Sequence, residues 1–198
     1  LIKRLPLRFI YDNNYFNDKY QGVPIGGFTQ MFEKMLDGIE VKLNKDYFYM
    51  KNYYNSIADK IVYTGCIDEF FDYKYGELGY RSLRFETGVL DMENYQGCAV
   101  INQCDHTEEY TRTVEHKHFE KVKTDHTVIT REYPIEYKRG MIPYYPINTK
   151  ENAEMYDKYR KESKTLTNII FGGRLAEYKY MDMHIVIESA MNKFRSAQ

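Results

Sequence analysis

The sequence lacks tryptophan, has only three cysteines and carries almost no net charge. Its 28 basic and 29 acidic residues leave a formal charge of -1, so we expect no global attraction to nucleic acid or to a membrane surface. No apolar run approaches the roughly 18 residues that a membrane-spanning helix needs. The cysteines are odd in number and scattered, which argues against a disulfide framework and predicts reduced thiols in a cytoplasmic protein.

Tyrosine, by contrast, is abundant: the chain has 21 tyrosines and 11 phenylalanines. Because tyrosine joins a flat apolar ring to a hydroxyl, it suits sites that bind sugars, bases and phosphates. An AT-rich genome would produce the same excess, so composition leaves both explanations open. The chain begins at Leu1-Ile2-Lys3-Arg4 without an initiator methionine, and we therefore expect it to be part of a longer protein.

Periodicity predicts helix and strand in alternation near the N-terminus. Apolar residues at helical spacing predict a helix over 28–36, and Gly38 lies where that helix would end in a left-handed residue. Alternating apolar and polar residues predict a short strand over 39–43, and a second short strand, bounded by glycine, is predicted over 60–65. The first 20 residues show no clean period and are expected to form an irregular arm.

The middle of the chain has the pattern of an antiparallel sheet. Strand candidates over 83–87, 99–101, 111–115 and 127–133 are separated by turn residues at intervals of about 12 residues. Pro143-Tyr144-Tyr145-Pro146 interrupts this pattern.

The C-terminal part returns to helix and strand. A charged surface helix is predicted over 152–161, and the apolar run 169–171 is typical of a buried parallel strand. A further amphipathic helix is expected to begin near Asp182, which is placed to cap it. The order predicts an α/β (α+β) chain in which an antiparallel sheet interrupts an α/β domain.

Gly172-Gly173-Arg174 directly follows the predicted buried strand and precedes the helix near Asp182. In open α/β sheets, ligands bind beyond the carboxyl ends of strands, and a helix N-terminus favours phosphate. Arg174 could pair with a pyrophosphate through two hydrogen bonds. A plain turn with a surface arginine explains the same residues, and on these residues alone it is the favoured interpretation.

A second candidate site gathers tyrosines near this turn, where their hydroxyls could donate to a diphosphate; core packing explains their spacing equally well. It comprises Tyr144, Tyr145, Tyr178, Tyr180 and Asp182. Several arginines could neutralise a diphosphate, and sequence spacing does not choose among them. These are Arg4, Arg8, Arg81, Arg84 and Arg112.

The histidines do not form a recognisable metal site. His116 and His118 would share one face of a strand, and His106 and His126 lie elsewhere in the same region. No cysteine or carboxylate lies at a familiar zinc spacing from them. We therefore predict neither a metal site nor a catalytic Cys–His pair.

Taken together, short motifs along nearly the whole chain resemble the UDP-galactopyranose mutase family. The matching stretches are Tyr11-Asp12-Asn13-Asn14-Tyr15-Phe16, Tyr20-Gln21-Gly22-Val23-Pro24, Phe85-Glu86-Thr87, Val100-Ile101-Asn102, Tyr110-Thr111-Arg112, Glu115-His116-Lys117-His118-Phe119, Pro143-Tyr144-Tyr145-Pro146, Phe171-Gly172-Gly173-Arg174-Leu175 and Tyr178-Lys179-Tyr180-Met181-Asp182-Met183. The resemblance implies an isomerase that interconverts UDP-galactopyranose and UDP-galactofuranose through a covalent adduct of reduced FAD with galactose. Its product would feed a cell-wall or capsular polysaccharide or a lipopolysaccharide.

The resemblance also implies roles for individual residues. Arg112 would meet the diphosphate, and Arg4 would belong to a mobile lid that closes on the substrate. Further substrate contacts are implied for Tyr15, Asn102, Tyr145 and Tyr180. Cofactor contacts are implied for Arg174, Met181, Asp182, Met183, Asp46 and Tyr47.

The same resemblance divides the chain into parts. Residues 1–20 would be an arm and lid from the helical domain, and residues 68–148 the antiparallel substrate domain. Residues 21–67 and 149–198 would be two parts of an FAD-binding Rossmann-like domain. The intact enzyme is expected to bind UDP-galactose and UDP and to form a homodimer.

One family feature is missing from the sequence. The strand, Gly-rich turn of G-x-G-x-x-G type and helix that cradle the FAD pyrophosphate are not found in these 198 residues. Most of the helical domain is missing too, in agreement with the lack of tryptophan. We therefore expect a fragment that is inactive alone, binds FAD weakly or not at all, and leaves strand edges unpaired.

Two other functions remain open. A stand-alone nucleotide-sugar binding module would use the same tyrosines and arginines. A flavin enzyme of amine-oxidase-like architecture would share the order of elements and the Gly-Gly-Arg turn. It would not explain the stretches at 11–16 and 143–146 together with the one at 178–183.

Overall fold

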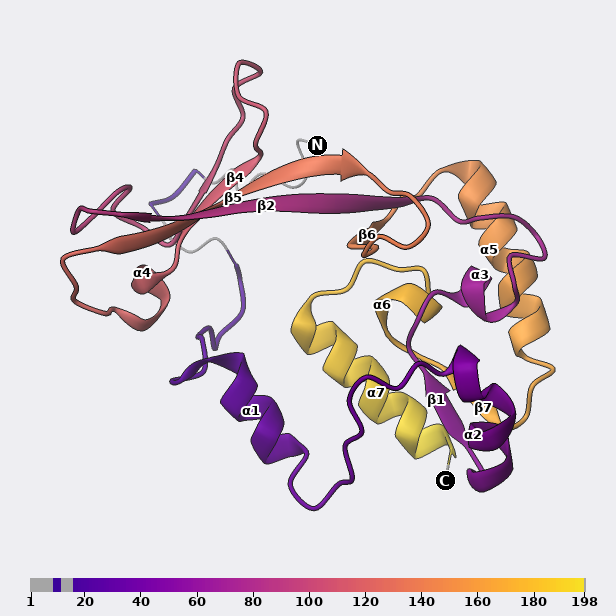
Figure 1. Cartoon of the computed structure of the whole chain (residues 1–198). Coiled ribbons are helices and arrows are strands. Elements are labelled where there is room, and N and C mark those ends of the chain that lie inside the picture. Colours follow the sequence, from indigo (N-terminus) through magenta and orange to yellow (C-terminus); the bar gives the residue numbers. More distant parts are fainter. Residues whose placement is uncertain (1–8, 12–15, 198) are drawn as a thin grey trace.

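The computed structural model describes residues 9–11 and 16–197 of the chain, which form two sheets and their flanking helices (Figure 1). A long antiparallel sheet extends away from a helix-rich part that contains a pair of parallel strands. The helices are α1 (Gly27–Met35), the 3-10 turn η2 (Phe48–Met50), α2 (Lys51–Ile57), α3 (Ile67–Phe70), α4 (Lys117–Glu120), α5 (Lys150–Ser163), α6 (Gly173–Ala176) and α7 (Met183–Ala197). The prediction of a mixed α/β chain with one antiparallel and one parallel sheet is confirmed.

The antiparallel sheet has the strand order β3-β4-β5-β2-β6. Its strands are β2 (Tyr80–Leu90), β3 (Val100–Asn102), β4 (Arg112–Glu115), β5 (Thr127–Glu136) and β6 (Tyr145–Pro146). The pairing of β2 with β5 is the longest, running from Arg81 opposite Glu136 to Leu90 opposite Thr127. Side chains of directly paired residues share one face of a sheet, so this register decides which residues can form a common site.

The parallel sheet consists of β1 (Ile61–Tyr63) and β7 (Ile169–Phe171), which are separated in sequence by the whole antiparallel sheet. Tyr63 and Ile169 are buried and pack with Phe70 and Ala176. Within the described part of the chain, β7 has β1 as its one paired neighbour. Among the described residues each of these two strands therefore has one edge without a pairing strand, and the link of these edges to a missing strand stays a prediction.

A tyrosine-rich core joins the two sheets. Tyr159 of α5 is completely buried, and its hydroxyl donates to the carbonyl of Gly76 at 2.7 Å. The hydroxyl of Tyr178 donates to the carbonyls of Gly79 at 2.5 Å and Ile147 at 3.0 Å. Because these carbonyls border β2 and β6, the two tyrosines fix the antiparallel sheet against the α/β part.

At the far end of the sheet, the Glu115 carboxylate is completely buried. It accepts hydrogen bonds from the backbone N–H of Tyr95 at 3.0 Å and of Gln96 at 2.8 Å, and from the Thr127 hydroxyl at 2.7 Å. His118 Nε2 lies 3.1 Å from the same carboxylate. Burial by itself would raise the pKa of Glu115, but these hydrogen bonds outweigh it and lower the pKa to about 2.

We expect this carboxylate to make the fold sensitive to acid. Since its folded pKa is depressed from 4.5 to about 2, its stabilising contribution is present above pH 4.5 and is lost as the pH falls toward 2. Thermal unfolding between pH 7 and 3 should show Glu115→Gln destabilised by about 1.5–3 kcal/mol at neutral pH. The two curves should converge as the solution becomes acidic, whereas the exposed-carboxylate control Glu120→Gln should follow the parent at every pH. A constant gap between parent and Glu115→Gln would contradict the assignment.

Most elements predicted from periodicity are found, with two corrections. The predicted strand over 39–43 is not formed, and Ile39, Val41 and Leu43 are 60%, 50% and 76% exposed. No described strand lies beside this segment to pair with it, and an unpaired strand is not stable. The Pro-rich stretch at 143–146, predicted to interrupt the sheet, supplies its edge strand β6.

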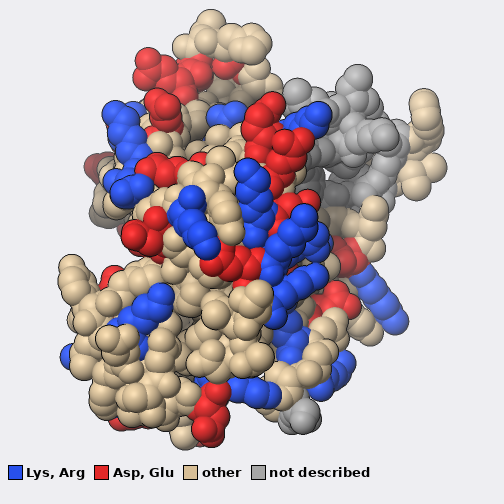
Figure 2. Space-filling view, turned by 90° about the vertical axis from the view of Figure 1, so that its right-hand side faces the viewer, with Lys and Arg blue, Asp and Glu red and all other residues tan. Residues whose placement is uncertain are grey.

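The surface carries no strong field of one sign on the side seen in Figure 2. Acidic and basic side chains are interspersed there, and an area with few charges lies at the lower left. This distribution gives no electrostatic reason for nucleic-acid binding on that face. Within the described residues, no helix combines the length and hydropathy that crossing a bilayer requires.

Candidate functional site

Arg174 lies at the carboxyl end of β7, in the first turn of α6. Gly172 is buried in an extended conformation and Gly173 has a φ of +82°, so the chain turns sharply here in a conformation that favours glycine. The turn directs the Arg174 guanidinium to the carbonyl of Tyr144, to which it donates at 3.1 Å. Its Nε is buried and has no hydrogen-bond partner among the described residues.

The Arg174 guanidinium also lies over two tyrosine rings. Its centre is 5.4 Å from the ring of Tyr145 and 4.7 Å from that of Tyr180, within the range of a cation–π contact. The two rings stack at 5.8 Å, which joins β6 to the segment before α7. The structure thus brings together three residues that lie in three separate motifs of the sequence.

Asp182 directly precedes α7 and contacts this group. Its carboxylate accepts a hydrogen bond from the Tyr180 hydroxyl at 3.1 Å, and its carbonyl accepts the first helical bond from Val186 at 3.0 Å. Burial, followed by the charge of Asp182, raises the pKa of Tyr180. Tyr180 therefore remains a neutral hydroxyl at physiological pH, although 51% of the residue is exposed.

The antiparallel sheet carries a row of paired residues that includes predicted site residues. Asn102, Arg112, Glu132 and Phe85 are opposite one another on β3, β4, β5 and β2. Arg112 donates from Nε to the Asn102 side-chain oxygen at 3.1 Å and lies 3.6 Å from Glu132. Paired residues share a face, so these four side chains lie on one side of the sheet.

Register and ring contacts connect this row to Arg174. Tyr145 pairs with Arg81, which is four positions before Phe85 on β2, so Tyr145 belongs to the same sheet face as Arg112. Phe85 contacts the ring of Tyr144 edge to face at 5.7 Å, and the carbonyl of Tyr144 holds Arg174. We call Asn102, Arg112, Tyr145, Arg174 and Tyr180 the arginine–tyrosine surface.

This surface presents two guanidinium groups and two phenolic hydroxyls. Arginine provides a planar fork of donors that matches phosphate oxygens, and a neutral tyrosine hydroxyl can donate to the same oxygens. The arrangement is suited to an anion with several oxygens beside a flat group that can lie against aromatic rings.

Other predicted residues have structural contacts. Tyr178, considered with the tyrosine cluster, is buried with both hydroxyl bonds made to backbone carbonyls, so core packing explains it. Met181 is 4% exposed, whereas Met183 at the start of α7 is 63% exposed. Arg4 and Tyr15 lie outside the described residues.

Asp46 and Tyr47 lie next to the aromatic core around Phe70. Asp46 accepts a hydrogen bond from the backbone of Phe48 at 2.7 Å, and the Tyr47 ring stacks on Phe70 at 6.0 Å. The Tyr47 hydroxyl donates to Asn55 at 3.0 Å. These contacts account for both side chains structurally, and their assignment to the cofactor stays a prediction.

Two of the histidines, His116 and His118, contact side chains of the antiparallel sheet. His116 and His118 do not share a strand face, because α4 begins at Lys117; His118 pairs with Glu115, and His116 lies 2.8 Å from the Thr130 hydroxyl. Among the described residues, no group of three or more histidine, cysteine, aspartate or glutamate side chains is arranged to hold a metal ion. The three cysteines are free, and burial raises the pKa of the Cys66 thiol to about 12.

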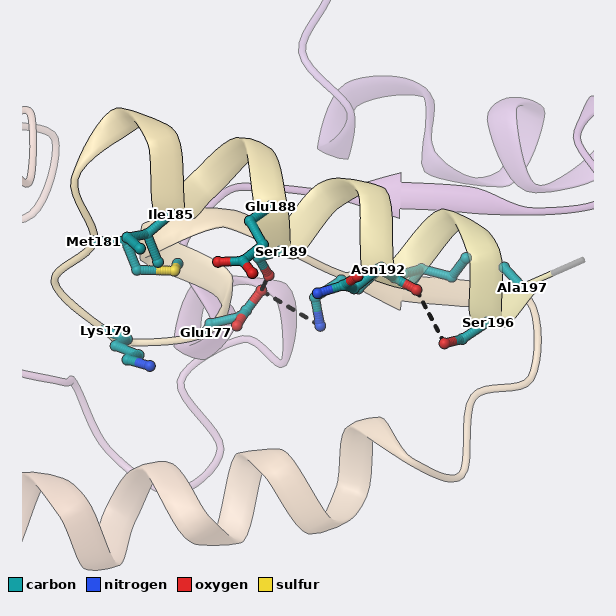
Figure 3. Close-up of a pocket in the computed structure, with 11 residues that line it drawn as sticks. Glu177, Lys179, Met181, Ile185, Glu188, Ser189, Asn192, Ser196 and Ala197 are labelled. Carbon is teal, nitrogen blue, oxygen red and sulfur yellow. Dashed lines mark hydrogen bonds and ion pairs between the residues drawn. The ribbon is translucent and has the colours of Figure 1, made fainter. Parts of the chain in front are cut away.

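A groove of about 650 Å³ lies along α7, between this helix and the segment 177–181 (Figure 3). Its polar groups bind one another: Glu177 accepts from Ser189 at 3.0 Å and pairs with Lys193 at 3.3 Å. Of the predicted site residues, the groove is lined by Met181 alone. The groove is therefore separate from the arginine–tyrosine surface.

Glu132 and Phe85 complete the row on the sheet, and neither was predicted as a site residue. Strand pairing places Glu132 opposite Arg112, and it places Phe85 opposite Glu132 although the two are 47 positions apart in the sequence. Phe85 stands in one of the matching motifs, but only the observed register identifies its neighbours. Glu132 could have been identified only from the pairing register of β4 with β5, which places it opposite Arg112.

Comparison with known proteins identifies relatives along the whole chain. The family model for UDP-galactopyranose mutase matches residues 1–180. The dTDP-fucopyranose mutase of Escherichia coli is 37% identical over 96% of this chain and 52% of its own length, and the probable UDP-galactopyranose mutase of Klebsiella pneumoniae is 38% identical over 96% of this chain and 50% of its own. The UDP-galactopyranose mutase of Mycoplasma pneumoniae is 32% identical over 98% of this chain. The chain spans about half the length of these curated relatives, and it belongs to the UDP-galactopyranose mutase family.

Proposed function

We propose that this chain provides the diphosphate-binding wall of a mutase that interconverts UDP-galactopyranose and UDP-galactofuranose. The observation that carries this proposal is the Arg174 guanidinium over the stacked rings of Tyr145 and Tyr180, beside the sheet face that bears Arg112. Membership in the family indicates the class of reaction. The arginine–tyrosine surface supplies guanidinium and hydroxyl donors that can bind the phosphate oxygens of a sugar diphosphate.

The roles of the residues follow from the charge that develops in this reaction. When the bond between the anomeric carbon and the diphosphate breaks, negative charge increases on the diphosphate oxygens. Arg112 stabilises that charge, while the hydroxyls of Tyr145 and Tyr180 donate to the oxygens and keep the leaving group in place. Retaining the diphosphate allows the same bond to form again after the sugar ring has changed size.

Arg174 and the residues at the start of α7 fit one edge of a flavin. The buried Nε of Arg174 lacks an acceptor, and Asp182 and Met183 stand at the helix N-terminus, where the dipole favours an electron-rich group. Reduced FAD, when bound, supplies the nucleophile for the anomeric carbon. Arg174 would donate to the flavin edge, and Met183 would supply apolar contact.

We expect the chain by itself to retain little FAD, because its sequence holds no Gly-rich turn for the pyrophosphate. Absorbance at about 450 nm should show far less than one flavin per chain after purification. Tryptophan cannot interfere with a flavin fluorescence titration, since the chain has none. A yellow preparation with one flavin per chain would contradict this expectation.

Titration of the chain with UDP tests the proposed function. We expect measurable binding by calorimetry, and Tyr180→Phe should weaken it by about 0.5–1.5 kcal/mol through loss of one hydrogen bond. Tyr133→Phe is the matched control, because the Tyr133 hydroxyl is bound to Glu86 on the opposite face of the sheet. An equal UDP affinity for Tyr180→Phe and the parent would remove Tyr180 from the site.

The choice of nucleotide can be tested in the same titration. One relative at 37% identity is a dTDP-fucopyranose mutase, so dTDP is the alternative to UDP that the titration should include. Within the arginine–tyrosine surface, Arg112, Tyr145 and Tyr180 are proposed to contact the diphosphate, which both nucleotides share. UDP and dTDP should therefore lose the same affinity in Tyr180→Phe, even if the parent prefers one of them.

A further inference from the structure

Glu132 occupies the centre of the row that carries Arg112. On β5 it is opposite Arg112 of β4 on one side and Phe85 of β2 on the other. The carboxylate lies 3.6 Å from a terminal nitrogen of the Arg112 guanidinium. Neither the composition nor the motifs of the sequence identified Glu132 as a candidate site residue.

The burial of the two side chains differs. The Glu132 side chain is 15% exposed, whereas that of Arg112 is 41% exposed. A carboxylate removed from water to this extent is stable only when it has a charged or hydrogen-bonding partner, and Arg112 is the cationic group beside it. The arginine thus pairs with the largely buried carboxylate while part of its own side chain remains open to solvent.

A second contact restrains the same guanidinium. Its Nε donates to the side-chain oxygen of Asn102 at 3.1 Å, from the strand on the other side of β4. With Asn102 at one edge and Glu132 near a terminal nitrogen, the long arginine side chain is held between two neighbouring strands. The terminal donors that these contacts do not use stay available for an anion.

We propose that Glu132 is a positioning residue that holds the Arg112 guanidinium in place for the substrate diphosphate. This inference rests on the proposed function, in which Arg112 meets that diphosphate. Glu132 acts by restricting the rotation of Arg112 and not by contacting the substrate. Orientation of this kind matters most when charge develops during bond cleavage, since a small misplacement of a charged group weakens transition-state stabilisation steeply.

The restraint can be measured without any activity. In the ¹⁵N-labelled chain, the side-chain resonances of Arg112 can be assigned by their loss in Arg112→Lys. Glu132→Gln should accelerate rotation of the Arg112 terminal nitrogens and their hydrogen exchange with water several-fold. Glu136→Gln, an exposed carboxylate four residues along the same strand, should leave both rates unchanged. Unchanged Arg112 rates in Glu132→Gln would overturn the inference.

Kinetics in a full-length mutase containing these residues give a second, independent readout. Glu132→Gln should reduce kcat roughly 10- to 100-fold while KM and UDP affinity change less than about threefold, because the arginine is still present but poorly oriented. Glu132→Asp should recover part of the loss. An unaltered kcat, or a loss explained wholly by a lower unfolding temperature, would overturn the positioning role. If Arg112→Ala keeps normal UDP affinity and turnover, the proposed function fails instead, and the rotation rates still decide whether Glu132 restrains Arg112.

Discussion

Replacing Arg112 with alanine is expected to reduce turnover about 10²- to 10³-fold in a full-length mutase that contains this chain, with flavin still bound. The physical reason is the charge on the departing diphosphate, which the guanidinium is placed to stabilise. Arg112 stands on the sheet face that also bears Tyr145, and its side chain is held by Asn102 and Glu132. Steady-state kinetics and the flavin absorbance of the purified variant provide the two measurements.

Arg84 offers a matched control for this substitution. It lies on β2, one position before Phe85, so its side chain is on the opposite face of the sheet. There it pairs with Glu86 and lies 4.0 Å from the ring centre of Tyr133. Arg84→Ala should keep turnover within about twofold, since a lone surface ion pair contributes little. Equal losses in the two variants would show that Arg112 acts through general charge or stability and not through its position.

The sequence predicts elements whose signal is local. The run 169–171 is apolar throughout and is followed by two glycines, and it forms β7 with the predicted bounds. The helix over 28–36 and the left-handed Gly38, with a φ of +76°, were also recognisable from their own residues. Periodicity and turn chemistry suffice in such cases because the residues that decide the conformation are neighbours in the chain.

The same approach failed where the outcome depends on distant residues. The alternation at 39–43 is typical of a strand, but a strand forms only when another strand pairs with it. The two-residue strand β6 was not predicted for the converse reason: it pairs with β2 at an edge position, where its one proline is tolerated. Short helices such as α3 carry too few residues for a periodic signal.

The candidate site was predicted in part for the same reason. Motif resemblance identified Arg112, Tyr145 and Tyr180 individually, while their arrangement depends on sheet register and on the turn at Gly173. Glu132 could not be found because it meets Arg112 only through the pairing of β4 with β5, which α4 and a loop separate in the sequence. The unpartnered Nε of Arg174 is likewise a property of three-dimensional burial and not of spacing.

Replacing Tyr159 with alanine is expected to destabilise the chain by about 3–5 kcal/mol, a large share of the stability of a domain of this size. The side chain is completely buried, and its ring contacts Phe71 at 5.9 Å and Tyr75 at 5.0 Å. Alanine would leave a cavity and also remove the hydroxyl that donates to Gly76 and accepts from the backbone N–H of Tyr75 at 3.0 Å. Urea unfolding followed by circular dichroism measures the change in the free energy of unfolding.

Two further variants separate the contributions of the ring and the hydroxyl. Tyr159→Phe keeps the packing but leaves two partly buried backbone groups without their partner, so it should cost about 1–3 kcal/mol. Tyr49→Ala removes a tyrosine that is 90% exposed and should change stability by less than about 0.5 kcal/mol. Because Tyr159 secures the turn that leads into β2, its loss should also broaden the unfolding transition if the two sheets then unfold separately. A sharp transition with a loss below about 1 kcal/mol in Tyr159→Ala would show that the tyrosine core does not hold the sheets together.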